Sequence, residues 1–316
     1  MTNSNDRLDH IHPELREFAA QFIPAIQLNA STLEAFRAGF GDIPLPDEQP
    51  VFRQSIPRTD GQPDVSVLVI NAKAGTRRPG ILHMHGGGFV LGAASASVPR
   101  MLPIALELDV TIVSVDYRLA PEANYAASIS DNYIALEWML ANAAKLGIAP
   151  DRIAVMGDSA GGGHAALTAI EARNRGAIDI AFQALIYPML DDRTGSTIMP
   201  PKPAGDVLWG ATANQFGWAS FLGMPPGGDD VPRSAVPART DDLTGLPSTF
   251  LIVGDLDLFF AEGKQFAQRL SAANIPTEFL VIEGAFHGFD MVEDAAPTFQ
   301  LKSALLSALR RGLGLN

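Results

Sequence analysis

Residues 152–162, which read RIAVMGDSAGG, constrain the fold of this chain more than any other segment. The apolar residues 153–156 predict a short buried strand, and an alanine-rich helical pattern follows. Between them lies Gly-Asp-Ser-Ala-Gly, the Gly-x-Ser-x-Gly pattern of a nucleophile elbow, a turn that holds a serine hydroxyl clear of a sheet. We expect a strained backbone at Ser159, and side chains at Gly157 and Gly161 should collide across the turn. The bare motif also fits a glycine-rich loop that contains serine by chance, so its weight depends on the rest of the chain.

Strand and helix patterns alternate along the chain from residue 51 onward. The predicted strands are residues 51–56, 65–70, 81–85, 110–115, 153–156, 180–187, 250–253 and 278–282, and the predicted helices are 124–144, 162–175, 263–273 and 297–313. An Asp60-Gly61 turn between the first two strands predicts an antiparallel pair. The alternation as a whole predicts an α/β fold, with a mostly parallel central sheet and helices on both faces.

Two segments depart from this alternation. Residues 1–50 look helical and amphipathic. Residues 188–246 contain many prolines, bulky aromatic side chains and no clear strand. An insertion of that length in an α/β domain favours a lid or cap, and a helix simply packed on the core is the alternative. Residues 51–187 and 247–316 are then the two parts of the core.

Composition and charge exclude several classes of function. The chain has no cysteine, which rules out disulfides, thiol catalysis and cysteine–metal sites and fits a reducing cytoplasm. Its formal net charge of −12 disfavours nucleic acid and anionic membranes as partners. No apolar run approaches the roughly 20 residues of a membrane span, and the polar N-terminus lacks the apolar core of a signal peptide. We therefore expect a cytoplasmic protein with no nucleic-acid partner and no stable membrane insertion.

A serine hydroxyl is a weak nucleophile at neutral pH and needs a base, which we seek among the six histidines. His287 follows a predicted strand in a loop between two glycines, and the functional groups of open α/β sheets gather at the carboxyl ends of strands. It also gives the chain order serine, acid, histidine. The others lie in a polar tail, on the helix after Ser159, or in the third strand and at its end: His10, His12, His164, His83 and His85. The sequence predicts His287 as the base, against the alternative of a packed loop histidine.

The acid that would orient this base has two candidates. Asp255 and Asp257 both follow the strand predicted at residues 250–253. Asp255 is nearer the strand end, whereas Asp257 lies further into the turn, where its side chain can reach a neighbouring loop. We expect the remaining carboxylate to bond a loop or to cap a helix.

Residues 85–89, His-Gly-Gly-Gly-Phe, directly follow the third predicted strand and are called the glycine loop below. They match the HGGG-type loop that supplies oxyanion-hole donors, each worth roughly 3 kcal/mol to a transition state. His83 and His85 could bind a metal from one side of a strand, but no convincing third ligand is nearby. The glycine loop could also bind phosphate, but the chain has no Gly-Lys-Ser/Thr and no Gly-x-Gly-x-x-Gly after a strand. The sequence therefore predicts no metal and no cofactor.

Three motifs together resemble the hormone-sensitive-lipase-like family of bacterial esterases, a group of α/β-hydrolases. Residues 85–89 resemble its HGGGF signature, residues 116–122 its DYRLAPE segment and residues 157–162 its GDSAGG elbow. The resemblance covers nearly the whole chain from about Val51 onward, and the N-terminal helices fit the cap of that family. Its members commonly dimerise, so the resemblance also implies a homodimer, of which the sequence itself gives no sign.

The resemblance assigns roles to individual residues. Residues 257–263, Asp-Leu-Phe-Phe-Ala-Glu-Gly, are similar to the family segment D-P-L-x-D-E-G, which implies Asp257 as the acid. The segment departs from the family at Leu258, Phe259 and Ala261. The implied oxyanion donors are the backbone N–H groups of Gly87, Gly88 and Ala160.

The implied activity is hydrolysis of small-molecule carboxylic esters with short- to medium-chain acyl groups. Ser159 would attack the ester carbonyl, His287 would accept its proton, and Asp257 would orient the imidazole. We expect aromatic residues of the two departing segments to form an apolar substrate pocket: Phe18, Phe22, Trp209, Phe216, Trp218 and Phe221. Two alternatives stay open, hydrolysis of an amide, carbamate or lactone at the same site, and a non-catalytic receptor on the same fold.

Overall fold

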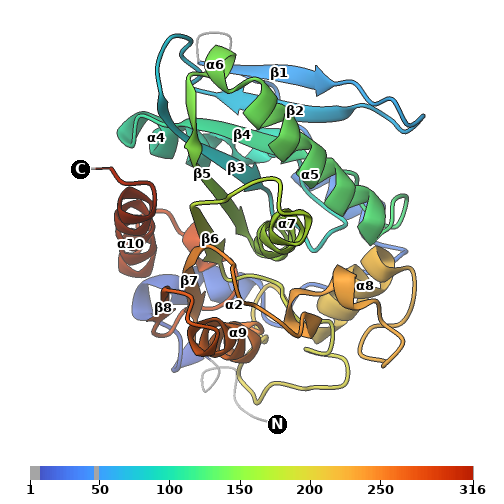
Figure 1. Cartoon of the computed structure of the whole chain (residues 1–316). Coiled ribbons are helices and arrows are strands. Elements are labelled where there is room, and N and C mark those ends of the chain that lie inside the picture. The colour runs from blue at the N-terminus through green and yellow to red at the C-terminus, as the bar shows by residue number, and fades with distance from the viewer. Residues whose placement is uncertain (1–7, 46–49, 316) are drawn as a thin grey trace.

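The computed structural model describes residues 8–45 and 50–315, and its centre is an eight-stranded sheet (Figure 1). The strands are β1 (Val51–Ile56), β2 (Val65–Ile70), β3 (Arg78–Met84), β4 (Thr111–Asp116), β5 (Ile148–Asp158), β6 (Phe182–Ile186), β7 (Ser248–Gly254) and β8 (Thr277–Ile282). Their order across the sheet is β1-β2-β4-β3-β5-β6-β7-β8. β2 pairs antiparallel with β1 and with β4, whereas all other pairs are parallel. The predicted antiparallel pair and the mostly parallel sheet are confirmed.

Helices cover both faces of the sheet, as predicted. They are α2 (Arg16–Gln21), α3 (Leu33–Phe40), α4 (Val98–Glu107), α5 (Tyr125–Ala141), α6 (Ala143–Leu146), α7 (Ala160–Arg175), α8 (Ala211–Leu222), α9 (Phe260–Ala272) and α10 (Ala296–Gly312). Helices α4 and α10 lie on one face, and α5 and α7 lie on the other (Figure 1). Within the described ranges, no helix has the length and apolar character needed to cross a membrane.

Helix α4 is not among the predicted helices. It holds Pro99 in its first turn and Pro103 in its interior. An interior proline removes a backbone hydrogen bond, so the local sequence argues against a helix here. Met101 and Ala105 are nevertheless buried, and α4 packs against β2 and β4. The burial of its apolar face against the sheet outweighs the local cost of proline.

Segments far apart in the chain share a second cluster of buried side chains beside the main core. Leu28 and Leu33 come from the N-terminal segment, Phe89 from the glycine loop, and Trp218 and Phe221 from α8. The ring of Phe89 stacks on Phe221 at 4.0 Å between centroids and meets Trp218 edge-on at 5.0 Å. The N-terminal segment and the insertion that contains α8 therefore pack together against the glycine loop.

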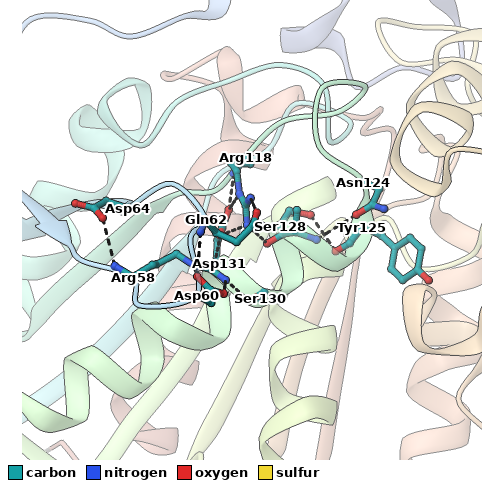
Figure 2. Close-up of polar contacts among 11 residues, drawn as sticks. Arg58, Asp60, Gln62, Asp64, Arg118, Asn124, Tyr125, Ser128, Ser130 and Asp131 are labelled. Carbon is teal, nitrogen blue, oxygen red and sulfur yellow. Dashed lines mark hydrogen bonds and ion pairs between the residues drawn. The ribbon is translucent and has the colours of Figure 1, made fainter.

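A polar cluster ties the turn between β1 and β2 to α5 and to the chain after β4 (Figure 2). Asp131 on α5 accepts hydrogen bonds from Arg118 Nε and Nη2, both at 2.8 Å, and from Arg58 Nη1 at 3.1 Å. The side chains of Arg58 and Asp131 are only 6% and 2% exposed. One buried carboxylate thus joins two arginines that come from separate parts of the chain, and Arg58 is also paired with Asp60, to which its Nε donates at 3.0 Å.

Loss of Asp131 should strongly destabilise the fold. In Asp131→Ala the buried guanidinium of Arg58 keeps only the half-exposed Asp60 as a partner, and Arg118 loses its hydrogen bonds to the carboxylate, so the free energy of unfolding should fall by about 2–3 kcal/mol. Urea unfolding followed by circular dichroism measures the change. Asp241→Ala is the control, because the Arg233–Asp241 pair has side chains 68% and 83% exposed and should contribute under about 1 kcal/mol. Equal effects of the two substitutions would contradict this account.

His164 on α7 is buried where the second cluster meets the main core. Its ring centroid lies 5.1 Å from that of Phe89 and 4.4 Å from that of Tyr117. Neither ring nitrogen has a hydrogen-bond partner among the described residues. Burial disfavours the charged imidazolium and lowers the pKa of His164 to about 3. The side chain is therefore neutral throughout the range in which most proteins are studied.

Acid should destabilise the protein partly through His164. Unfolded histidine binds a proton near pH 6.5, so below that pH the unfolded state takes up a proton that folded His164 refuses. The free energy of unfolding therefore falls by up to about 1.4 kcal/mol for each pH unit below 6.5, until the pH reaches the pKa of folded His164. His164→Leu should therefore flatten the fall in unfolding free energy between about pH 7 and about pH 5 by roughly one proton. Urea titrations at several pH values measure the slope, with the exposed His10→Leu as control, and an unchanged slope in His164→Leu would refute the argument.

Candidate active site

Ser159 lies at the junction of β5 and α7, and its backbone has φ +56° and ψ −121°. Three hydrogen bonds hold this conformation. The Ser159 N–H donates to Ile186 O at 2.9 Å, and its carbonyl accepts from the N–H of Gly163 at 3.1 Å and of Met189 at 2.9 Å. A non-glycine residue at positive φ is strained, so the predicted conformation of the turn is present.

Gly157 and Gly161 lie on either side of the turn at Ser159, and each position requires glycine for a different steric reason. A Cβ at Gly157 would lie 2.2 Å from Gly161 O, which is the predicted collision across the turn. A Cβ at Gly161 would instead lie 2.1 Å from Met84 O, at the end of β3. The expected collision across the turn is therefore wrong for Gly161. This glycine instead lets the start of α7 approach the end of β3, a neighbouring strand.

Ser159, His287 and Asp257 form one hydrogen-bonded series at the carboxyl ends of the strands. His287 Nε2 lies 2.9 Å from Ser159 Oγ, and His287 Nδ1 lies 2.8 Å from Asp257 Oδ2. An ionised carboxylate only accepts hydrogen bonds, so Nδ1 carries the proton and Nε2 is free to accept one from the serine. Asp257 Oδ1 accepts from the N–H of Phe259 at 2.8 Å, which holds the carboxylate in place. All three side chains are buried.

The structure distinguishes the two carboxylates that sequence reasoning left open. Asp255 Oδ1 accepts a hydrogen bond from the N–H of Gly284 at 2.7 Å and does not contact His287. It therefore bonds the start of the loop that carries His287, while Asp257, two residues on, reaches the imidazole itself.

The glycine loop leaves its backbone N–H groups free beside Ser159. Gly87 and Gly88 have φ values of +122° and +59°, which turn their N–H groups in a way few other residues permit. A Cβ at Gly88 would lie 2.3 Å from the ring of Trp209. Over the described ranges, no acceptor is bonded to the N–H of Gly87, Gly88 or Ala160. These three donors are available to an oxygen of a bound molecule.

Residues 116–122 (DYRLAPE) hold the glycine loop through hydrogen bonds to its carbonyl groups. Tyr117 Oη donates to His85 O at 2.7 Å, and the N–H of Ala120 donates to Phe89 O at 2.9 Å. Arg37 on α3 donates to Val90 O at 3.0 Å. Sequence reasoning missed Arg37, because nothing in its local pattern indicates a partner so far along the chain.

Arg37 also forms an ion pair with Glu122, the last residue of that segment. Its two terminal nitrogens lie 2.7 and 2.8 Å from the carboxylate oxygens. This hydrogen bonding to the guanidinium lowers the pKa of Glu122 to about 2. The N-terminal segment is thereby fastened to the chain that supports the glycine loop.

A cavity of about 450 Å³ opens over Ser159 and His287. Of the six aromatic residues predicted to line the pocket, only Trp209 does so. The remaining lining includes the aromatic residues Phe40 and Tyr187, several charged side chains, and four larger aliphatic residues or methionines: Ile26, Leu91, Leu208 and Met291. These last four gave no signal in the sequence, because single apolar residues in loops follow no periodic pattern.

The other five aromatic residues lie elsewhere, and their placement corrects the pocket prediction. Trp218 and Phe221 are buried in the second cluster, and Phe216 packs against it. Phe18 stacks on Phe286 at 6.2 Å between ring centroids, and Phe22 lies 4.8 Å from Phe18. All five stabilise the packing of the N-terminal segment and the insertion, which is where large aromatic surfaces gain most from burial.

The alternative of a metal at His83 and His85 finds no ligand set. His83 Nδ1 lies 2.8 Å from Ser114 Oγ, and His85 Nδ1 lies 2.8 Å from Gly86 O. In the part of the chain that the structure describes, no group of three histidine, aspartate or glutamate side chains is arranged to hold a metal ion.

This chain is similar in sequence and in structure to known proteins that are named as esterases. A family model described as alpha/beta hydrolase fold matches residues 81–291. Esterase LipI of Mycobacterium tuberculosis is 33% identical, covering 74% of this chain and 71% of that protein, and carboxylesterase NlhH of the same species is 34% identical, covering 74% of each. Among solved structures, a bacterial heroin esterase superposes with a TM-score of 0.87 at 35% identity, covering 97% of this chain and 99% of its own. Esterase LipW from Mycobacterium marinum gives 0.81 at 29% identity, covering 98% and 97%.

The two carboxylates after β7 should differ sharply in their effect on ester hydrolysis. Asp257→Asn removes the charge that stabilises an imidazolium and favours the wrong tautomer of His287, so kcat should fall roughly 10³- to 10⁴-fold. Asp255→Asn keeps an oxygen acceptor for Gly284 and should cost less than about tenfold. Initial rates with p-nitrophenyl butyrate, on variants whose circular dichroism matches the parent protein, compare the two. The reverse ranking would place the acid at Asp255.

Proposed function

This chain belongs to the hormone-sensitive-lipase-like family of bacterial esterases and is a carboxylic ester hydrolase, and we propose that Ser159 is its nucleophile, His287 its base and Asp257 its acid. The proposal rests on one observation, the hydrogen-bonded series from Asp257 through His287 to Ser159. Three unpaired backbone N–H groups beside Ser159 support it further.

In the proposed reaction His287 Nε2 takes the hydroxyl proton while Ser159 Oγ attacks the ester carbonyl carbon. Asp257 keeps the proton on Nδ1 and stabilises the imidazolium that forms. The carbonyl oxygen becomes an oxyanion and accepts hydrogen bonds from the N–H groups of Gly87, Gly88 and Ala160, which need no rearrangement. The imidazolium then protonates the departing alcohol, and water repeats the sequence on the acyl-enzyme to release the acid.

The proposed substrates are small-molecule esters with short- to medium-chain acyl groups. A cavity of about 450 Å³ accommodates molecules of that size. Rates across p-nitrophenyl esters from acetate to palmitate test this part of the proposal, because the longest chains should exceed the cavity and give the lowest kcat/KM.

Three further parts of the proposal concern the whole molecule. Residues 1–50 and 188–246 are the cap, which the shared second cluster supports, and residues 51–187 and 247–316 are the core. The protein works in the cytoplasm, in keeping with a chain that has no cysteine. It forms a homodimer, as members of its family commonly do.

Removing the Ser159 hydroxyl should abolish hydrolysis. Ser159→Ala deletes the nucleophile, so hydrolysis of p-nitrophenyl butyrate should fall at least about 10⁴-fold, and a fluorophosphonate probe that labels the parent protein should leave the variant unlabelled. Ser303→Ala, at an exposed position on α10, is the control and should keep full activity. A folded Ser159→Ala protein with activity near that of the parent would overturn the assignment.

A further inference from the structure

Arg100 joins the two chain segments that carry the nucleophile and the base. It is the third residue of α4, and its guanidinium lies at the wall of the cavity over Ser159. Arg100 Nη2 lies 3.1 Å from Asp158 Oδ1, and Nη1 lies 3.0 Å from Asp290 Oδ2. Asp158 directly precedes Ser159, and Asp290 follows His287 by three residues. One side chain thus connects the turn at Ser159 to the loop that carries His287.

The bridge continues to the imidazole through Tyr187. Tyr187 Oη donates to the second oxygen of Asp290, Oδ1, at 2.7 Å. The ring of Tyr187 meets the ring of His287 edge to face, with 4.8 Å between centroids. Asp290 is therefore held from two sides, and a shift of Arg100 would be transmitted both to the chain after His287 and to the ring packed on it.

Arg100 also compensates a charge beside the oxyanion donors. Asp158 is buried, and its Oδ2 would lie 2.5 Å from a Cβ at Gly86, so the carboxylate lies against the glycine loop. Burial raises the pKa of Asp158, but the charge of Arg100 and interaction with His83 more than offset burial, and the pKa lies well below its usual range. The carboxylate stays ionised, and an uncompensated negative charge here would oppose the developing oxyanion.

We propose that Arg100 is a positioning residue of the hydrolytic site, which keeps Ser159 and His287 aligned and neutralises Asp158 next to the oxyanion donors. This inference rests on the proposed roles of Ser159 and His287. Arg100 acts through Asp158 and Asp290, since both of its terminal nitrogens are bonded to these carboxylates.

The charged and titratable groups around His287 determine what the pH dependence should show. Those that contact it or share its cavity are Asp257, Ser159, Tyr187, His85, Arg100, Asp158, Asp290 and Glu293. Burial lowers the pKa of His85, so this ring is neutral in the working range. Arg100 is the one cation of the set. Removal of the Arg100 charge should favour the protonated form of His287 and move the acid limb of the kcat/KM profile to higher pH.

The decisive comparison is between Arg100→Gln and Arg100→Lys, assayed with a neutral ester and normalised to active sites counted with a fluorophosphonate. Arg100→Gln should lower kcat about 10- to 100-fold, change KM less than about threefold and raise the acid limb by about half a pH unit. Arg100→Lys keeps the charge but has no fork to span both carboxylates, so the acid limb should stay at the parent position while kcat recovers only in part. Arg310→Gln on α10 is the control: it breaks the 3.4 Å ion pair with Glu107, at the far end of α4 from Arg100, and should match the parent protein.

Asp290→Asn gives a second, independent test, which stands even if Arg100→Gln fails to fold. It breaks the bridge on the histidine side and removes a negative charge, so kcat should fall while the acid limb moves to lower pH, opposite to Arg100→Gln. Unchanged kcat per active site in both variants, a rise in KM alone, or equal losses with no movement of the acid limb would each overturn the proposal. Failure of the proposed function looks different, because Ser159→Ala would then retain activity.

Discussion

The backbone of Ser159 is the constraint on which the site depends. Positive φ at a residue with a side chain is unfavourable, so the turn between β5 and α7 persists only because its surroundings hold it. Hydrogen bonds to Ile186, Gly163 and Met189 supply that support from a neighbouring strand, from the helix and from the chain after β6. The close approach permitted by Gly161 brings α7 against the end of β3. The hydroxyl is therefore positioned by main chain from several elements, which explains why so short a motif determines so much of the architecture.

The oxyanion donors pose the opposite problem, because their N–H groups must stay unpaired and yet be held still. The glycine loop meets both needs by being held through its carbonyl groups. Tyr117, Ala120 and Arg37 donate to carbonyl oxygens within or next to the loop and leave the N–H groups of its glycines free. Ala160 has a free N–H for a simpler reason, since the first residues of a helix have no acceptor within it. Preorganised donors of this kind lose no free energy to rearrangement when charge develops.

Sequence reasoning succeeded where the signal is local and failed where the contact is distant. The eight predicted strands are present because apolar runs between turns report burial in a sheet directly. Helix α4 was missed because Pro103 opposes it locally, and packing against β2 and β4 decides the outcome.

Other misses concern contacts that only the folded chain creates. Asp255 and Asp257 could not be separated by their own positions, since the distinguishing partners, Gly284 and His287, lie on another loop. The aromatic residues assigned to the pocket failed for a related reason: Trp218 and Phe221 are as suited to a buried cluster as to a cavity wall, and only their neighbours decide. The family resemblance selected Asp257 and the oxyanion donors, whereas it carried no information on Arg100 or Arg37.

Most buried carboxylates in the described part of the chain are paired with arginine, whereas Asp257 is paired with His287. Asp131 pairs with Arg58 and Arg118, and the fully buried Asp192 pairs with Arg239. Glu262 has no arginine partner; burial raises its pKa well above the usual range, and its Oε1 accepts a hydrogen bond from the N–H of Leu190 at 2.6 Å. Asp158 belongs to the paired group. An ionised carboxylate can stand next to oxyanion donors only where a cation faces it, so the position of its arginine matters for the reaction as well as for the fold.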